Sequence, residues 1–376
     1  MAIHTVLVKV ASRCNINCSY CYVYNMGDNG WEDMPPLITS DITSSLSKSL
    51  AELAADQNEP FATVLHGGEP LMLGARKLET LLKSLRNALP AAHPICMQTN
   101  GMLLTESLLE ICVAYRVSIS VSIDGPEVQN DKFRVDHRNR GTFERVLSGL
   151  RKLKEHDASQ FLFSGTLSVI DPSSDPRNVY EFLKSLGSPS LDFLYRDGNH
   201  TSLPYGKKSW QSTEYGDWLI TLIDVYLTDR SPPRIRFIDD LIRLLLGSSG
   251  IKEGLGTKEY GIIVIESDGS IAKNDTLKSA YNGADRFTET WNIKEDRIGD
   301  IVQSETYTAY HETQKPTSLA CLTCEYLNIC GGGMPLHRWE SGSGFNNPSI
   351  YCNDQKKIIT HLIRQLSTQG ISCDFA

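Results

Sequence analysis

Several features that mark other protein classes are missing or scarce in this chain of 376 residues. No apolar run reaches the length of a membrane-spanning helix, and the first residues lack the charged and apolar regions of a signal peptide. Basic residues are outnumbered by acidic ones, 37 against 45, which gives a net charge of −8 and disfavours nucleic acid as a partner. We therefore expect a cytoplasmic protein that binds neither a membrane nor nucleic acid.

The composition that remains is ordinary, except for the cysteines. Hydrophobic residues make up 40% and charged residues 22%, and the length suits a large α/β domain with a smaller one. There are ten cysteines, and several of them are clustered. In a reducing compartment, clustered cysteines indicate metal binding or catalysis rather than disulfides.

Apolar segments alternate with amphipathic ones through the first 230 residues. The pattern predicts strands at residues 4–11, 61–65, 95–98, 117–122, 161–168 and 191–195, with helices at 40–55, 76–88, 106–115, 142–155 and 178–186. This alternation indicates a parallel α/β sheet. Polar clusters follow the ends of the strands, which is where active sites lie in β/α barrels.

The first cysteine group reads Cys14-x3-Cys18-x2-Cys21, directly after the first predicted strand, and Tyr20 precedes the last cysteine. Three thiolates on one loop can hold three irons of a [4Fe–4S] cluster and leave the fourth iron open. The alternative is a zinc knuckle or a set of buried thiols. Zinc sites usually show paired cysteines and four ligands, so the spacing favours the cluster.

This loop, with the Gly-Gly-Glu-Pro sequence at residues 67–70, resembles the signature of the radical S-adenosylmethionine (radical SAM) enzymes. The resemblance implies a partial, TIM-like (β/α)6 barrel whose open iron chelates S-adenosyl-L-methionine (SAM) and cleaves it to a 5′-deoxyadenosyl radical. It also implies an electron donor such as a flavodoxin or ferredoxin. The SAM contacts that it implies are Tyr20, Gly67, Gly68, Glu69, Pro70, Asn100, Ser120, Ser122, Asp124 and Arg134.

Some of these residues have a plainer alternative role. Glu69 could accept a hydrogen bond from the SAM ammonium or simply order its loop, and Asp124 could cap a turn rather than bind ribose with Ser120 and Ser122. Arg134 is the residue we expect to pair with the SAM carboxylate. Arg138 and Arg140 compete for that role, and any of the three could belong to a solvated charged face.

The C-terminal part holds a second cysteine group, Cys321-x2-Cys324-x5-Cys330, with Cys352 further on. It follows a hairpin predicted at residues 262–271 around Asp-Gly. Together these features resemble the SPASM extension of radical SAM peptide maturases. We therefore predict a radical SAM partial barrel at residues 1–230 and a SPASM-like iron–sulfur domain at 231–376.

A full SPASM extension carries two auxiliary [4Fe–4S] clusters, and this chain departs from that pattern. One ligand of the barrel-proximal cluster has no counterpart, and two others fall on Asn274 and Met334. All four ligands of the outer cluster are present. We expect two clusters in total, one on Cys14, Cys18 and Cys21 and one on Cys321, Cys324, Cys330 and Cys352, with a four-cysteine zinc site as the alternative to the second.

The stretches at residues 268–278, 331–338 and 344–352 are similar to those of maturases that install cyclophane crosslinks in ribosomally synthesised peptides. That similarity implies a precursor peptide as substrate, abstraction of a side-chain β-hydrogen and a carbon–carbon bond to an aromatic residue. Asp275 and His337 are the candidate catalytic bases, although a turn-capping Asp and a packed His are equally good descriptions. Because the first strand begins at once, we expect no separate leader-peptide domain before it.

Two other functions stay open. A sulfatase-type maturase that makes formylglycine, or a thioether-forming maturase, would use the same radical chemistry, but these commonly keep both auxiliary clusters. A non-catalytic iron–sulfur or zinc protein would leave residues 67–70 and 120–124 without a role. The sequence does not identify the modified residues of the peptide, the way a leader is bound or the oligomeric state.

Overall fold

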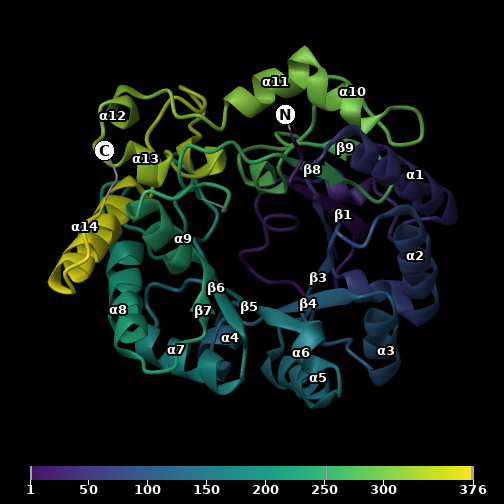
Figure 1. Cartoon of the computed structure of the whole chain (residues 1–376), viewed down its shortest axis with the longest axis horizontal. Helices are drawn as coiled ribbons and strands as arrows, with labels where there is room; N and C mark the ends of the chain where they lie inside the picture. The colour runs from purple at the N-terminus through teal and green to yellow at the C-terminus, as the bar shows by residue number, and fades with distance from the viewer. Residues whose placement is uncertain (1, 251, 374–376) are drawn as a thin grey trace. The chain divides into compact units, whose positions relative to one another are not determined.

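The strand that enters the cysteine loop is an interior strand of a mostly parallel sheet. In the computed structural model, which describes residues 2–250 and 252–373, β1 (Thr5–Ala11) pairs in parallel with β2 (Ala62–Gly67) on one side. On its other side it pairs, also in parallel, with β8 (Ile262–Ile265), a strand from the C-terminal part of the sequence. Residues far apart in the chain therefore meet beside the cysteine loop (Figure 1).

The chain divides into two units. The first contains Met1–Ile123, Asn130–Thr166 and Gly261–Tyr310, and the second contains Asp124–Gln129, Leu167–Tyr260 and His311–Ala376. Each unit is thus built from separate stretches of sequence. The boundary at residue 230 that we expected from the sequence stays a prediction.

In the first unit the strands follow the order β9-β8-β1-β2-β3-β4-β5, with β9 antiparallel to β8. The pairing places Gln98 of β3 beside Ser120 of β4, so polar side chains of neighbouring strands share one face. The remaining strands of this order are β3 (Ile95–Thr99), β4 (Val117–Ser122), β5 (Phe163–Val169), on which the chain passes into the second unit, and β9 (Ile271–Ala272).

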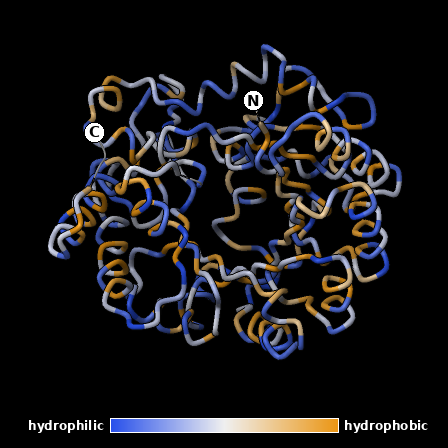
Figure 2. The backbone as a smooth tube through the Cα atoms, viewed as in Figure 1, coloured by the Kyte–Doolittle hydropathy of each residue, from blue (hydrophilic) through white to orange (hydrophobic). Residues whose placement is uncertain are grey.

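Amphipathic helices connect these strands. Figure 1 shows α1, α2 and α3 in succession along one side of the strands, and Figure 2 shows polar and apolar turns alternating along them. The Thr39 side chain caps α1 by accepting a hydrogen bond from the Ile42 amide, as expected for a helix that begins with Thr-Ser-Asp. These helices are α1 (Ser40–Asp56), α2 (Gly74–Ala88), α3 (Glu106–Ala114), α4 (Glu127–Phe133), α5 (Phe143–Glu155) and α6 (Ser159–Leu162), followed later by α10 (Ile298–Gln303) and α11 (Glu305–Glu312).

The second unit pairs β6 (Ser190–Leu194) with β7 (Arg234–Ile235) in parallel. Lys207 and Asp354 form a fully buried ion pair at 2.6 Å, and Asp354 also accepts the Gly216 amide, which ties α14 to α8. The helices of this unit are α7 (Pro176–Ser185), α8 (Glu214–Thr228), α9 (Arg236–Leu245), α12 (Leu319–Leu322), α13 (Leu327–Cys330) and α14 (Cys352–Thr368).

The strands and helices predicted for the first 230 residues are present, with ends displaced by a few residues. The Asp-Gly hairpin is confirmed as β8 and β9, and the Asp268 side chain accepts the Ser270 amide in its turn. None of the helices in residues 2–250 and 252–373 has the length and hydropathy of a membrane crossing.

Candidate active site at the cysteine loop

The three cysteines of the first group lie on an irregular loop that is anchored by its backbone. The Cys21 amide donates to the Cys18 carbonyl, and the Ser19 amide donates to the Phe133 carbonyl at the end of α4. Burial raises the pKa of the Cys14 thiol to about 12, and Glu69 and the other two thiols add to this effect. Burial also raises the pKa of Cys21. The Cys14 and Cys21 thiols therefore stay protonated unless a cation such as iron stabilises the thiolates, which fits two corners of a cluster, and Cys18 lies on the same loop.

The glycines of the second motif allow two backbone segments to touch. A Cβ atom on Gly68 would lie 2.1 Å from the Arg13 carbonyl oxygen and 2.2 Å from the Tyr24 hydroxyl, and a Cβ on Gly67 would lie 2.1 Å from the Ala11 carbonyl. The Gly68 amide donates to the Ala11 carbonyl across this contact. The glycines are therefore required for the close approach of the cysteine loop itself.

Glu69 is buried, and the hydrogen bonds that it accepts hold the motif in place. Its carboxylate accepts hydrogen bonds from the Leu71 amide at 3.0 Å, from the Thr99 hydroxyl at 2.6 Å and from the Asn100 amide at 2.8 Å. Pro70 opens the short 3-10 helix η2 (Pro70–Leu73), which Glu69 caps. This arrangement supports the loop-ordering role, and a contact between Glu69 and SAM stays a prediction.

Two further predicted SAM contacts lie against the cysteine loop. The Arg134 guanidinium donates to the Tyr20 hydroxyl at 2.9 Å, and the Asn100 side chain donates to the Asn15 side chain at 2.7 Å. Arg140 instead pairs with Asp136 and is largely exposed. Of the competing arginines, Arg134 therefore has the position that fits a ligand of this loop.

The polar residues at the end of β4 separate into two environments. Ser120 and Ser122 share the less buried face of the strand, and Ser122 accepts a hydrogen bond from Gln98 at 2.8 Å. Asp124 is buried and accepts the Val169 amide at 3.1 Å. The serines fit a ligand-facing role, whereas the described contact of Asp124 is that of a backbone cap.

The hairpin brings Asp275 to the cysteine loop. The Tyr22 hydroxyl donates to Oδ2 of Asp275 at 2.6 Å, and the Lys9 ammonium pairs with the same oxygen. Burial would raise the pKa of Asp275, but the ammonium groups of Lys9 and Lys278 outweigh burial and hold it well below its usual range. Asp275 is therefore an ionised carboxylate. Its hydrogen-bond partner Tyr22 is the residue that follows Cys21.

The four cysteines of the second group come together in the second unit. Burial raises the pKa of Cys330 to about 12, and the thiols of the other three cysteines add to it. A tetrahedral zinc site would hold its sulfurs roughly 3.8 Å apart, given Zn–S bonds of about 2.3 Å. The contacts among these thiols fit either metal, so the auxiliary [4Fe–4S] cluster and its four-cysteine zinc alternative both stay predictions.

His337 lies in a packed, buried environment that does not favour proton transfer. It is buried in the second unit, with its ring against Tyr351 at a centroid distance of 4.9 Å. Burial, assisted by Arg338, lowers the pKa of His337 to about 3, so the ring is neutral and a weak proton acceptor. A catalytic role for His337 stays a prediction, and this environment favours packing.

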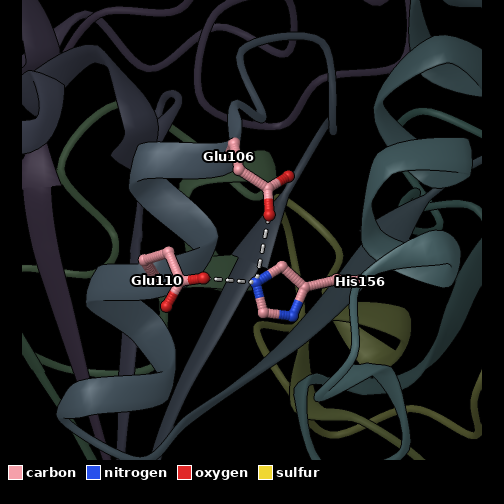
Figure 3. Close-up of side chains that lie close together, drawn as sticks. All are labelled: Glu106, Glu110 and His156. Carbon is pink, nitrogen blue, oxygen red and sulfur yellow. Dashed lines mark ion pairs between the residues drawn. The ribbon is translucent and has the colours of Figure 1, made fainter.

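A second group of ionisable side chains lies away from the cysteine loop (Figure 3). Nε2 of the buried His156 points between the carboxylates of Glu106 and Glu110, at 3.4 Å from each. Nδ1 of the same ring accepts the Ala158 amide at 3.1 Å, so the neutral ring carries its proton on Nε2. The Nε2 atom makes these two close contacts without hydrogen-bond geometry, and the group ties α3 to the end of α5.

Comparison with known proteins agrees with this geometry. The family model of the Radical SAM superfamily matches residues 8–184, which include the cysteine loop and the motif at 67–70. Residues 8–184 are those of a radical SAM enzyme. Among curated proteins, the chain is 24% identical over 378 residues to the cysteine-type anaerobic sulfatase-maturating enzyme of Clostridium novyi, with 96% of each chain covered.

Two further similarities extend over most of the chain. It is 28% identical over 364 residues to the serine-type anaerobic sulfatase-maturating enzyme of Bacteroides thetaiotaomicron, covering 89% of this chain and 83% of that one. The solved structure of anSMEcpe with bound AdoMet and the Cp18Cys peptide superposes with a TM-score of 0.81 at 21% identity, over 97% of this chain and 98% of the other. The expected α/β partial barrel with a SPASM region is confirmed.

Sequence reasoning missed residues that the structure adds to this site. Tyr22 directly follows the last cysteine of the loop, and the sequence assigns it no role. Lys9 is the one charged residue in the apolar run of β1, a signal that could have marked it. Thr99 anchors Glu69 and carries no distinguishing signal in the sequence.

Proposed function

We propose that this radical SAM enzyme oxidises the β-carbon of a serine or cysteine side chain in a peptide and so produces formylglycine. The observation that carries the proposal is the Tyr22–Asp275 hydrogen bond of 2.6 Å directly beside the cysteine loop. The full-length similarity to serine- and cysteine-type sulfatase-maturating enzymes supports it. This similarity favours formylglycine formation over the crosslinking reaction that the sequence motifs favoured.

When bound, the cluster and SAM would supply a hydrogen-abstracting radical to the substrate. Cys14, Cys18 and Cys21 would hold the cluster, and the segment from Gly67 to Pro70, Ser120, Ser122 and Arg134 would surround SAM. After one hydrogen atom has left the β-carbon, oxidation of serine to the carbonyl level requires the loss of one proton and one electron. The same loss from cysteine gives a thiocarbonyl, which water hydrolyses to the carbonyl with release of hydrogen sulfide. The chain must therefore provide a proton acceptor and an electron acceptor.

The proton acceptor in this proposal is the Tyr22–Asp275 pair. Asp275 is buried, while Tyr22 is partly exposed, so the substrate proton passes to the Tyr22 oxygen as the Tyr22 proton passes to Oδ2 of Asp275. The low pKa of Asp275 keeps it free of a proton before the reaction but makes it a weak base. It can therefore accept the proton only after the electron has left, when the substrate is a protonated carbonyl and a strong acid. Cys321, Cys324, Cys330 and Cys352 would hold an auxiliary cluster, which would supply the electron acceptor.

The second candidate is the cyclophane crosslink, and one observation favours it. Sulfatase-type enzymes with a full SPASM extension carry cysteines at the positions occupied here by Asn274 and Met334. Asn274 caps the short helix η3 (Asp275–Ser279), and Met334 packs against Gly254, so neither site is prepared for a second auxiliary cluster.

The test is the nature of the product. The reconstituted enzyme is given a serine- or cysteine-containing peptide of the sulfatase type and, separately, a short precursor encoded beside its gene. Serine oxidation and crosslinking both remove two hydrogens, so mass alone does not separate them. A product that reacts with a hydrazide establishes the carbonyl. A product that is inert to hydrazide and whose fragmentation stops across an aromatic residue establishes the crosslink and overturns the proposal.

A further inference from the structure

The hairpin and the residues after it carry a buried cluster of charged side chains. The reaction proposed above uses only one of them, Asp275. Three carboxylates, from Glu266, Asp275 and Asp285, have oxygens within 4.8 Å of one another. The Lys278 ammonium lies among them, at 2.6 Å from Glu266, 3.2 Å from Asp275 and 3.3 Å from Asp285. All four side chains are less than one-tenth exposed.

These side chains come from different parts of one fold. Glu266 directly follows β8, Asp275 and Lys278 are at the two ends of one turn of η3, and Asp285 follows in the next loop. Burial would lower the pKa of Lys278, but Asp275 and Glu266 outweigh it and raise that pKa above its ordinary value. The ammonium is therefore permanently charged, and removing it would leave three buried carboxylates, of which Asp275 keeps its ion pair with Lys9.

The two oxygens of Asp275 are held by different groups. Oδ2 accepts the Tyr22 hydroxyl and pairs with Lys9. Oδ1 is buried, and no donor among the described residues reaches it with hydrogen-bond geometry, while the Lys278 ammonium lies 3.2 Å away. Rotation of the carboxylate about its χ2 torsion is therefore opposed at Oδ1 by Lys278.

We propose that Lys278 is a positioning residue, whose ammonium is clamped by Glu266 and Asp285, holds Oδ1 of Asp275 and thereby aims Oδ2 at the Tyr22 hydroxyl. This inference rests on the oxidation proposed above. Lys278 touches neither substrate nor cofactor in this role. It acts on the yield of product for each SAM consumed, because it orients the group that removes the proton.

The competing explanation is that Lys278 only balances buried charge. A pair of substitutions separates the two. Lys278→Met removes the ammonium but keeps the length of the side chain, and Asp285→Asn removes one carboxylate, so the double variant keeps the parental net charge of the cluster. If charge balance were the whole role, the double variant would work as the parent does.

The holoenzyme, reconstituted anaerobically, is assayed for 5′-deoxyadenosine and for modified peptide in the same reaction. We expect the double variant to form 5′-deoxyadenosine within about twofold of the parent and product at least about tenfold less, since a displaced catalytic group costs up to about a hundredfold. Lys184→Met is the matched control, because it also breaks a lysine–carboxylate pair, with Asp229 in the second unit, and should leave the ratio unchanged.

Lys278→Arg guards against a folding defect, since it keeps the buried charge but cannot place a donor at the same point. It should shift the ratio in the same direction by a smaller factor. A parental ratio in both Lys278 variants overturns the positioning role. A parent that cleaves SAM but modifies no peptide contradicts the proposed oxidation instead, so the two failures are distinguishable.

Discussion

At the scale of single residues, backbone contact and side-chain orientation decide what the cysteine loop can do. Gly68 has the tightest requirement, because an added Cβ meets the Arg13 carbonyl and the Tyr24 hydroxyl together. Neither can move without moving the cysteine loop. Glycine is thus needed at position 68 for backbone packing, independently of any contact with a ligand.

Gly68→Ala should therefore damage both folding and cluster loading. We expect a loss of about 1–3 kcal/mol or more in the free energy of unfolding, the usual cost of overpacking, with reduced iron content. Gly342→Ala is the control, because no heavy atom lies within 4 Å of its added Cβ. Unfolding in urea and iron analysis measure the two effects, and equal behaviour of both variants would contradict the close contact.

Asp275→Asn tests the proton acceptor directly. The amide keeps the shape of the side chain but accepts a proton far less readily, so product formation should fall by about a hundredfold or more, while formation of 5′-deoxyadenosine continues. Both compounds are measured by chromatography with mass detection. Full product formation by this variant would leave Asp275 with only the structural role.

At the scale of elements, the pairing of β8 with β1 matters most. Through this pairing, the Asp-Gly hairpin and η3 deliver Asp275 and Lys278 to the strand that carries Lys9. The two cysteine groups belong to separate units, so their metal contents should be separable by substitution.

Metal analysis tests that separation. By ligand arithmetic, the reconstituted enzyme should hold about eight irons and eight sulfides. Replacement of Cys14, Cys18 and Cys21 by Ala should abolish SAM cleavage and leave about four irons on the second group. About four irons with one zinc in the parent would favour the zinc alternative, and SAM cleavage by the triple variant would contradict the assignment of the loop.

At the scale of the whole molecule, two neutral histidines, the half-buried His66 and the buried His337, link stability to pH. Burial lowers the pKa of His66 to about 4 and that of His337 to about 3, from an ordinary value of 6.5. The unfolded chain binds protons below pH 6.5 while the folded chain does not. Their contribution to stability is therefore complete above pH 6.5 and is lost progressively as the pH falls toward 4.

The expected size follows from the shift. At about 1.4 kcal/mol for each pKa unit, His66 alone should cost about 3 kcal/mol between pH 6.5 and 4. Urea unfolding at a series of pH values should show this slope, and His337→Gln should flatten it compared with the parent. The same slope in parent and variant would mean that His337 is solvated when folded.

The sequence alone determined the order of strands and helices and both cysteine groups, because these depend on local periodicity and on spacing. Thr39 caps its helix, and the Asp-Gly turn closes its hairpin, through contacts a few residues apart. Only the tertiary structure decided that β8 lies parallel to β1, since a short apolar strand carries no label for its neighbour. For the same reason only the fold could join Tyr22 to Asp275 across 253 positions of sequence and surround Lys278 with three carboxylates.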